Sequence, residues 1–369
     1  MSKINWKKVI GWGVAALVVI GVVFYNSQNQ KESQNDKTVL VILPMTGNAA
    51  VWGEHFSKGV DYFKNQNPNA KINIKVIDSQ MNPSITISAL QQELLRGKPY
   101  AILSTTSPVT VPVSAFASKE GLFTIGCVMS DKILENQNVQ RVYPSAYDST
   151  KPVSDYAKKN YKRLAILYGN EEGGLSAYKV MSKEYKTDDN EIVFTDSYGV
   201  NDVVDTHTLL YKVLYHKPDA IFISGHGSAY WAIIRELKSM KYQGGILTDL
   251  FFANPTQLEQ LGKAAEGIIF TASETDLSDS TRKQVIEAKR FYQEKYNQIP
   301  NYTGITVYEA LSILNDMAEK GINPSNQTFE DMKKFEGVGG TLEFLPNGDM
   351  HYPWIAVTIK DGKIVPVTE

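Results

Sequence analysis

The stretch that decides the fold is residues 39–59, which read VLVILPMTGNAAVWGEHFSKG. An aliphatic, mostly β-branched run at 39–43 is followed by Pro44 and Gly47, and a helical pattern comes after these breakers. This order of strand, loop and helix predicts one unit of an open parallel sheet, in which ligands bind where strands end and helices begin. Trp52 lies in this region, and two interpretations stay open for it: a core side chain, or an aromatic surface for a ligand.

Strand-like and helix-like patterns alternate along most of the chain. The candidate strands are short and apolar throughout, as expected of parallel strands that are buried on both faces. They lie at residues 38–43, 72–77, 100–103, 122–126, 163–168, 191–195, 219–223, 245–248 and 267–271. Helical patterns fill the gaps between them. This repeated β-α-β order predicts an α/β protein with two doubly wound parallel-sheet lobes.

The alternation stops near the C-terminus. Asn347-Gly348-Asp349 and Asp361-Gly362-Lys363 are tight-turn signals, and strand-like segments lie beside them. We therefore expect the chain to end in a small antiparallel addition.

The N-terminus has the pattern of a membrane or signal segment. Lysines at positions 3, 7 and 8 precede an uncharged apolar run at residues 9–25, and a polar stretch follows at residues 26–37. We expect an uncleaved signal anchor over residues 1–25, with a removed signal peptide as the alternative. The lysines then stay in the cytoplasm, so the rest of the chain is extracytoplasmic, in the periplasm or on the outer face of the cell membrane. Residues 26–37 are expected to act as a flexible tether.

Composition excludes several classes of function. The net charge of −2 gives no indication of nucleic-acid binding, and the single cysteine, Cys127, excludes an internal disulfide. No two histidines have metal-ligand spacing, so we expect no metal site. Glu171 and Glu172 form a carboxylate pair, but adjacent side chains point apart and glycines follow, which predicts a solvated loop. With no nucleophile, base or cofactor motif, the chain is expected to be neither an enzyme nor a cofactor protein.

Several motifs together resemble those of one known family. They are spread along the chain in order: Leu43-Pro44-Met45-Thr46-Gly47, Asp78 with Asn82-Pro83, Tyr308-Glu309-Ala310, Phe335-Glu336-Gly337-Val338-Gly339 and Asn347-Gly348-Asp349. Over residues 38–369 the chain resembles the type I periplasmic binding proteins of the branched-chain amino acid branch, the leucine/isoleucine/valine-binding proteins of ABC importers.

This resemblance implies two lobes with a ligand cleft between them. The first lobe would comprise residues 38–147 plus 275–335, and the second residues 148–274 plus 336–369. Three crossovers, near Tyr147, Ser273 and Phe335, would join the lobes and act as the hinge.

The resemblance also implies a set of ligand-binding residues on the first lobe. Trp52 falls where family members place an aromatic residue against the ligand side chain. Ser107 falls on the serine that binds the ligand carboxylate, and Ser130 falls on a hydroxyl residue at the next strand end. Val128 would offer backbone groups there. Hydroxyls and free amides at helix N-termini bind an anionic oxygen well.

The second lobe departs from the family pattern. His226 occupies an aromatic position. The acidic residue that pairs with a ligand ammonium falls at Leu250, and a one-residue shift would bring Asp249 into that role. A buried ammonium without a counter-charge is expensive, so the identity of the ligand stays open.

Two functions are therefore expected from the sequence. The first is an extracytoplasmic solute-binding protein that captures a small polar ligand, an amino acid or a related carboxylate or amide, and delivers it to an ABC transporter permease. The alternative is a ligand-binding sensor that acts through a membrane partner. In both, residues 9–25 attach the chain to the membrane.

Overall fold

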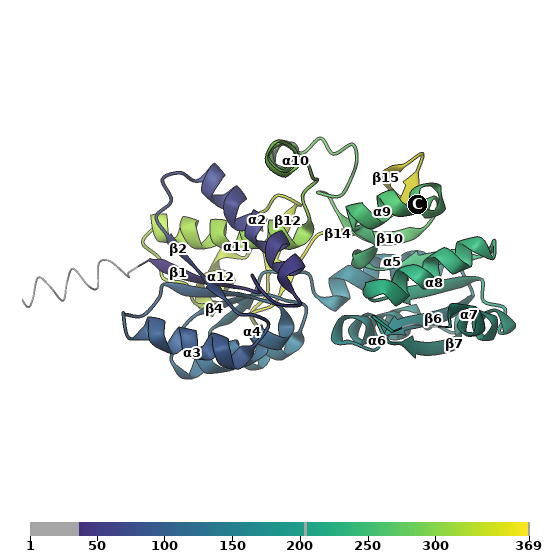
Figure 1. The fold of residues 1–369 in the computed structure, drawn as a ribbon, viewed down its shortest axis with the longest axis horizontal. Helices are drawn as coiled ribbons and strands as arrows, with labels where there is room; N and C mark the ends of the chain where they lie inside the picture. Colours follow the sequence, from purple (N-terminus) through teal and green to yellow (C-terminus); the bar gives the residue numbers. More distant parts are fainter. Residues whose placement is uncertain (1–36, 203–204, 368–369) are drawn as a thin grey trace, which may run out of the picture.

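The computed structural model describes residues 37–202 and 205–367, which form two lobes that lie side by side (Figure 1). The predicted anchor at residues 1–25 and nearly all of the predicted tether lie outside the described residues. Within the described ranges, no helix combines the length and apolar character that crossing a membrane requires.

The first lobe is built on a five-stranded parallel sheet with the order β2-β1-β3-β4-β5. Its strands are β1 (Thr38–Leu43), β2 (Asn73–Asp78), β3 (Ala101–Thr105), β4 (Thr124–Cys127) and β5 (Val139–Arg141). Its helices are α2 (Ala50–Gln66), α3 (Pro83–Leu94), α4 (Ser107–Lys119), α10 (Lys283–Tyr296), α11 (Tyr302–Glu319) and α12 (Asn326–Met332).

The alternation of side chains along β1 explains why helices cover both faces of this sheet. Val39, Val41 and Leu43 point to the face covered by α2 and α11, whereas Leu40 and Ile42 point to the face covered by α3 and α4. Successive residues of a strand face opposite sides, so an unbroken apolar run needs helices on both.

The second lobe contains a seven-stranded sheet with the order β15-β14-β10-β9-β8-β6-β7. Its strands are β6 (Arg163–Gly169), β7 (Glu191–Tyr198), β8 (Ala220–Ser224), β9 (Gly245–Thr248), β10 (Ile269–Ser273), β14 (Trp354–Lys360) and β15 (Lys363–Pro366). Its helices are α5 (Ala146–Asn160), α6 (Glu172–Tyr185), α7 (Thr206–Tyr215), α8 (Gly227–Ser239) and α9 (Pro255–Leu261). Strands β14 and β15 run antiparallel at one edge.

The predicted fold class, two lobes with parallel sheets and helices on both faces, is confirmed. Every predicted strand is present within two residues of its expected start. Two elements were not anticipated: β5 and α12. Strand β5 includes Gln140 and Arg141, which are fully buried only because distant parts of the chain pack over them.

The chain crosses between the lobes three times, and the third crossover differs from the prediction. The first lies between β5 and α5 at residues 142–145, and the second between β10 and α10 at residues 274–282. The third lies between β13 and β14 at residues 352–353, not near Phe335.

The reason is a separate three-stranded antiparallel sheet, whose first strand contains Phe335. It comprises β11 (Lys334–Glu336), β12 (Thr341–Phe344) and β13 (Met350–His351). Leu342, Phe344 and Met350 belong to the same buried cluster as β1 and α11. These contacts place residues 336–351 against the first lobe, in contrast to the expected assignment to the second, and we propose the lobe boundary at residues 352–353.

Buried carboxylates hold the three crossovers together. Asp148, just after the first crossover, lies 2.9 Å from Nδ1 of His351 and accepts a hydrogen bond from the backbone of Tyr352 at the third. Asp276, in the second crossover, accepts hydrogen bonds from the amide and hydroxyl of Ser273. Glu309 of α11 accepts from the Tyr352 hydroxyl at 3.0 Å and from the Val338 amide at 2.8 Å.

Burial in this hinge predicts a pH dependence of stability. Burial raises the pKa of Glu309 from 4.5 to about 7, so the neutral form is favoured in the folded chain. The contribution of neutral Glu309 to the stability of the folded state is complete below pH about 4.5 and is lost as the pH rises through about 7. Glu309→Gln keeps the shape without the ionisation. We expect this variant to lose less stability than the wild type between pH 5 and pH 8, by roughly 1–3 kcal/mol.

Urea unfolding at the two pH values would measure this difference. Glu294→Gln, an exposed substitution on α10, is the control and should follow the wild type. Equal pH dependence in Glu309→Gln and the wild type would contradict the buried-acid account.

Candidate ligand-binding cleft

The loop after β1 is held rigidly at the carboxyl end of the first sheet. The Asp78 carboxylate, at the end of β2, accepts hydrogen bonds from the amide of Met45 at 2.9 Å and from the hydroxyl of Thr46 at 2.6 Å. Helix α2 then passes close to this loop at Gly53, where a Cβ atom would lie 2.2 Å from the carbonyl oxygen of Pro44. Only glycine permits this approach. It fixes the first turn of α2, which carries Trp52.

Trp52 faces the second lobe. Its ring is half-buried at the edge of the first-lobe core, 6.1 Å from the ring of His55. Its centroid also lies 6.5 Å from that of His226, in an edge-on arrangement. One side of Trp52 therefore packs on the core, as the first interpretation expected, and the other side meets a residue of the opposite lobe. Its role as an aromatic surface for a ligand stays a prediction.

The two predicted serines lie on neighbouring strand ends. Strands β3 and β4 pair side by side, with Thr105 opposite Cys127. Ser107 is the first residue of α4, and no hydrogen bond of its hydroxyl occurs within the described ranges. Ser130 is buried, and its hydroxyl donates to Oε1 of Glu172 at 2.6 Å. This bond crosses from the first lobe to the second.

The side chain of Val128 is buried in a small apolar cluster. It directly follows β4, is 2% exposed, and packs against Ile133 and Val139. Its predicted contribution through backbone groups stays a prediction.

A buried guanidinium holds the turn that carries Ser130. Arg141 of β5 is fully buried, and it donates to the carbonyl of Met129 at 2.5 Å and to the carboxylate of Asp131 at 2.7 Å. Both carboxylate oxygens of Asp349 accept from the same guanidinium, at 2.7 and 2.8 Å. Ser130 thus lies between two residues that Arg141 binds directly.

On the second lobe, His226 is fixed by the backbone around it. It precedes α8, between Gly225 and Gly227. At Gly227 φ is +84°, and a Cβ would lie 2.3 Å from the Val200 carbonyl oxygen, so this turn requires glycine. Nε2 of His226 lies 3.9 Å from the Glu171 carboxylate.

Asp249 is bound within its own lobe. It is 2% exposed and accepts hydrogen bonds from the Ser224 hydroxyl at 2.6 Å and from the amides of Gly225 and Phe251 at 3.0 and 3.1 Å. Burial raises its pKa to about 7. Through these hydrogen bonds the carboxylate links the end of β8 to the turn after β9. The next residue, Leu250, belongs to the first-lobe core cluster.

Sequence reasoning missed the glutamates that follow β6. They were expected in a solvated loop, yet Glu171 caps α6 by accepting from the amides of Gly173 and Gly174, both at 2.6 Å. Glu172 reaches Ser130. Glutamate is not a preferred N-cap residue, so no capping signal indicated this role. Their position directly after the predicted strand at residues 163–168 could have placed both glutamates at this sheet edge.

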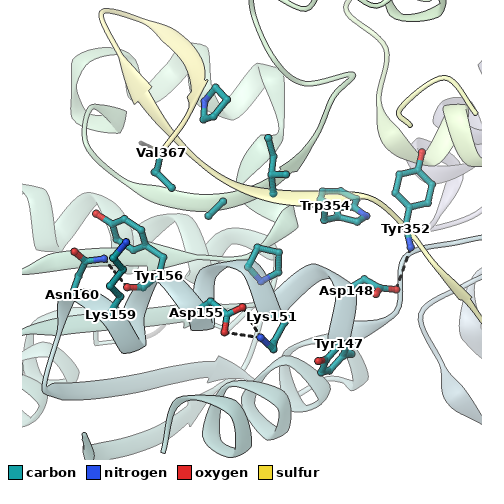
Figure 2. A pocket seen from close by; sticks show the side chains of 14 residues that line it. Tyr147, Asp148, Lys151, Asp155, Tyr156, Lys159, Asn160, Tyr352, Trp354 and Val367 are labelled. Carbon is teal, nitrogen blue, oxygen red and sulfur yellow. Dashed lines mark hydrogen bonds and ion pairs between the residues drawn. The ribbon is translucent and has the colours of Figure 1, made fainter. Parts of the chain in front are cut away.

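Two of the cavities within the described residues lie near the hinge and the contact between the lobes, away from the predicted ligand residues. One of about 410 Å³ lies between the lobes, where His55 and Lys58 of α2 face Asn254 and Glu259. The other, of about 660 Å³, lies between α5 and β14 near the hinge (Figure 2). Figure 2 shows the Lys151–Asp155 ion pair beneath it. None of the six predicted ligand residues lines either cavity.

The family of the chain follows from its sequence as a whole. The family model for periplasmic binding proteins matches residues 38–363. This chain is a member of the periplasmic binding protein family. The type I resemblance deduced from the motifs is therefore confirmed, and membership implies an extracytoplasmic location.

Individual relatives of this periplasmic binding protein are distant in sequence. A Leu/Ile/Val-binding protein homolog of Brucella melitensis is 22% identical over 352 residues, which cover 89% of this chain and 93% of the relative. Two solved structures share the fold. The leucine-binding protein LivK of Thermotoga maritima is 20% identical, with a TM-score of 0.73 over 90% of this chain and 98% of that one. A solute-binding protein of an ABC transporter from Rhodopseudomonas palustris, in complex with 3,4-dihydroxybenzoic acid, is 18% identical, with a TM-score of 0.75 over 90% and 95%.

The Arg141 network predicts a large loss of stability when its main anion is removed. Asp349→Ala leaves a buried guanidinium with one carboxylate instead of two. We expect the free energy of unfolding to fall by about 3 kcal/mol, measured by urea unfolding. Asp279→Ala breaks an exposed ion pair with Lys363 and serves as the control, with an expected loss of at most about 1 kcal/mol. Similar losses in the two variants would show that the buried network contributes no more than a surface pair.

Proposed function

We propose that this periplasmic binding protein captures a small carboxylate-bearing solute between its lobes and delivers it to an ABC transporter permease. One observation carries the proposal: Trp52, in the first turn of α2, lies edge-on to His226 of the second lobe, and Ser130, just after β4, donates a hydrogen bond to Glu172 of that lobe. A cleft at the carboxyl ends of parallel strands is where α/β folds bind ligands.

The chemistry of the first lobe suits a carboxylate beside an apolar group. The Ser107 hydroxyl stands at the N-terminus of α4, where the first amides of a helix lack intrahelical partners and favour anions. Ser130 adds a second hydroxyl, and the Trp52 ring offers an apolar face. Ligands of two structural neighbours fit this description: isoleucine in LivJ of Streptococcus pneumoniae and 3,4-dihydroxybenzoic acid in the R. palustris protein.

Delivery to a permease and attachment by residues 9–25 complete the proposal. A binding protein that is tethered to the outer face of the membrane stays close to its transporter. In this arrangement the lobes close on the ligand, and the closed form is the one that a permease recognises.

Two substitutions test the ligand contacts on the first lobe. Ser107→Ala removes a hydroxyl donor to a charged group and should weaken binding by about tenfold or more. Trp52→Ala should weaken it at least as much, and the protein should stay folded because Trp52 is only partly buried. The ligand is first found by a thermal-shift screen of the purified protein against amino acids, amides and short carboxylates, and affinities are then measured by calorimetry.

Ser84→Ala is the matched control for Ser107, because Ser84 is an exposed serine in the first turn of α3 on the same lobe. It should bind like the wild type. Normal binding by Ser107→Ala, together with unfolding of Trp52→Ala, would show that Trp52 serves the core and would remove both residues from the site.

Closure is a separate prediction. Ligand should draw the lobes together about the crossovers at residues 142–145, 274–282 and 352–353, so the radius of gyration should fall in small-angle scattering. Trp52→Ala at the same ligand concentration should show a smaller decrease. An unchanged radius at saturating ligand would contradict a closing cleft.

A further inference from the structure

Glu172 lies where it would contact a ligand bound by the serines of the first lobe. It is the first residue of α6 and is exposed, and its carboxylate accepts a hydrogen bond from the Ser130 hydroxyl at 2.6 Å, across the contact between the lobes. The preceding residue, Glu171, is committed to capping the helix and lies 3.9 Å from Nε2 of His226. Of the two glutamates, Glu172 is the one that reaches the opposite lobe.

The position of Ser130 is fixed by its neighbours, so the place where its hydroxyl contacts Glu172 is fixed as well. Arg141 binds the residues on both sides of Ser130, Met129 and Asp131. The positive charge of that guanidinium is already shared between Asp131 and Asp349. It is therefore balanced from within the first lobe and does not neutralise Glu172.

A ligand carboxylate that uses the same hydroxyl would lie close to the Glu172 carboxylate. Two like charges at short range repel each other. A positively charged group on the ligand, next to its carboxylate, would reverse the sign of this interaction. The residues that the sequence suggested for this purpose are otherwise engaged, because Asp249 has three donors of its own lobe and Leu250 packs in the first-lobe core.

We propose that Glu172 determines the ligand class of the cleft: it favours ligands in which a cationic group adjoins the carboxylate and disfavours plain carboxylates. This inference rests on the proposed function. It assigns the counter-charge to the end of β6, in contrast to the end of β9 that the sequence pointed to. Glu172 is a specificity residue in this role, and the fold does not depend on it.

Calorimetry with matched ligand pairs tests the assignment. Each pair consists of an amino acid and the same molecule without its amino group, starting with isoleucine and 3-methylpentanoate, and benzoate is a further plain carboxylate. The wild type should prefer the amino acid of the pair. In Glu172→Gln, affinity for the amino acid should fall by about tenfold or more and affinity for the plain carboxylate should rise.

Three further variants make the outcome specific. Glu172→Ala removes the carboxylate without leaving an amide donor, and should shift the preference in the same direction. Ser130→Ala keeps the Glu172 charge, so it should weaken both ligands of a pair and keep the preference for the amino acid. Glu184→Gln, on the same helix, should behave like the wild type.

The possible failures are distinct. If the wild type prefers plain carboxylates, or if Glu172→Gln changes both ligands of a pair equally, the role of Glu172 is wrong while the solute-binding function stands. If the wild type binds neither class of ligand, the proposed function itself is wrong.

Discussion

A fully buried guanidinium, that of Arg141, connects the parts of the first lobe on which the cleft depends. Charge can be kept in a protein interior only when its hydrogen-bonding capacity is met, and here Asp349, Asp131 and the Met129 carbonyl meet it. Asp349 comes from the turn between β12 and β13, far along the chain. The pair therefore draws the C-terminal antiparallel sheet onto the first lobe and braces the turn that carries Ser130.

The hinge follows from this arrangement. Because β11–β13 pack with the first lobe, the chain returns to the second lobe only at Tyr352, and all three crossovers meet beside the same polar cluster. Asp148 links the first crossover to the third, and Glu309 holds Tyr352 from α11. Buried carboxylates that accept several hydrogen bonds give these connections defined geometry, at the cost of raised pKa values for Glu309 and Asp276.

The two walls of the proposed cleft differ in chemical character. The first-lobe wall combines an aromatic ring, two serines and a helix N-terminus, which suits a carboxylate beside an apolar body. The second-lobe wall holds His226 and the two glutamates after β6. Structural neighbours with amino acid and aromatic acid ligands share this fold at similar TM-scores. The fold therefore leaves the ligand open, and in our proposal the side chains at the strand ends of the second lobe separate the ligand classes.

The sequence by itself determined the fold class and the family, because both depend on local signals. The apolar run at residues 39–43, its breakers and the following helix repeat along the chain, and the motifs at Pro44, Tyr308 and Asn347 stand in family order. The resemblance also placed Trp52 and His226 on facing sides of the two lobes, where their rings meet. Tertiary structure alone decided which lobe holds β11–β13, that Asp249 binds donors of its own lobe, and that Glu172 reaches Ser130. These outcomes depend on contacts between segments far apart in the sequence, such as Arg141 with Asp349, and no local periodicity encodes which distant partner a buried charge will find.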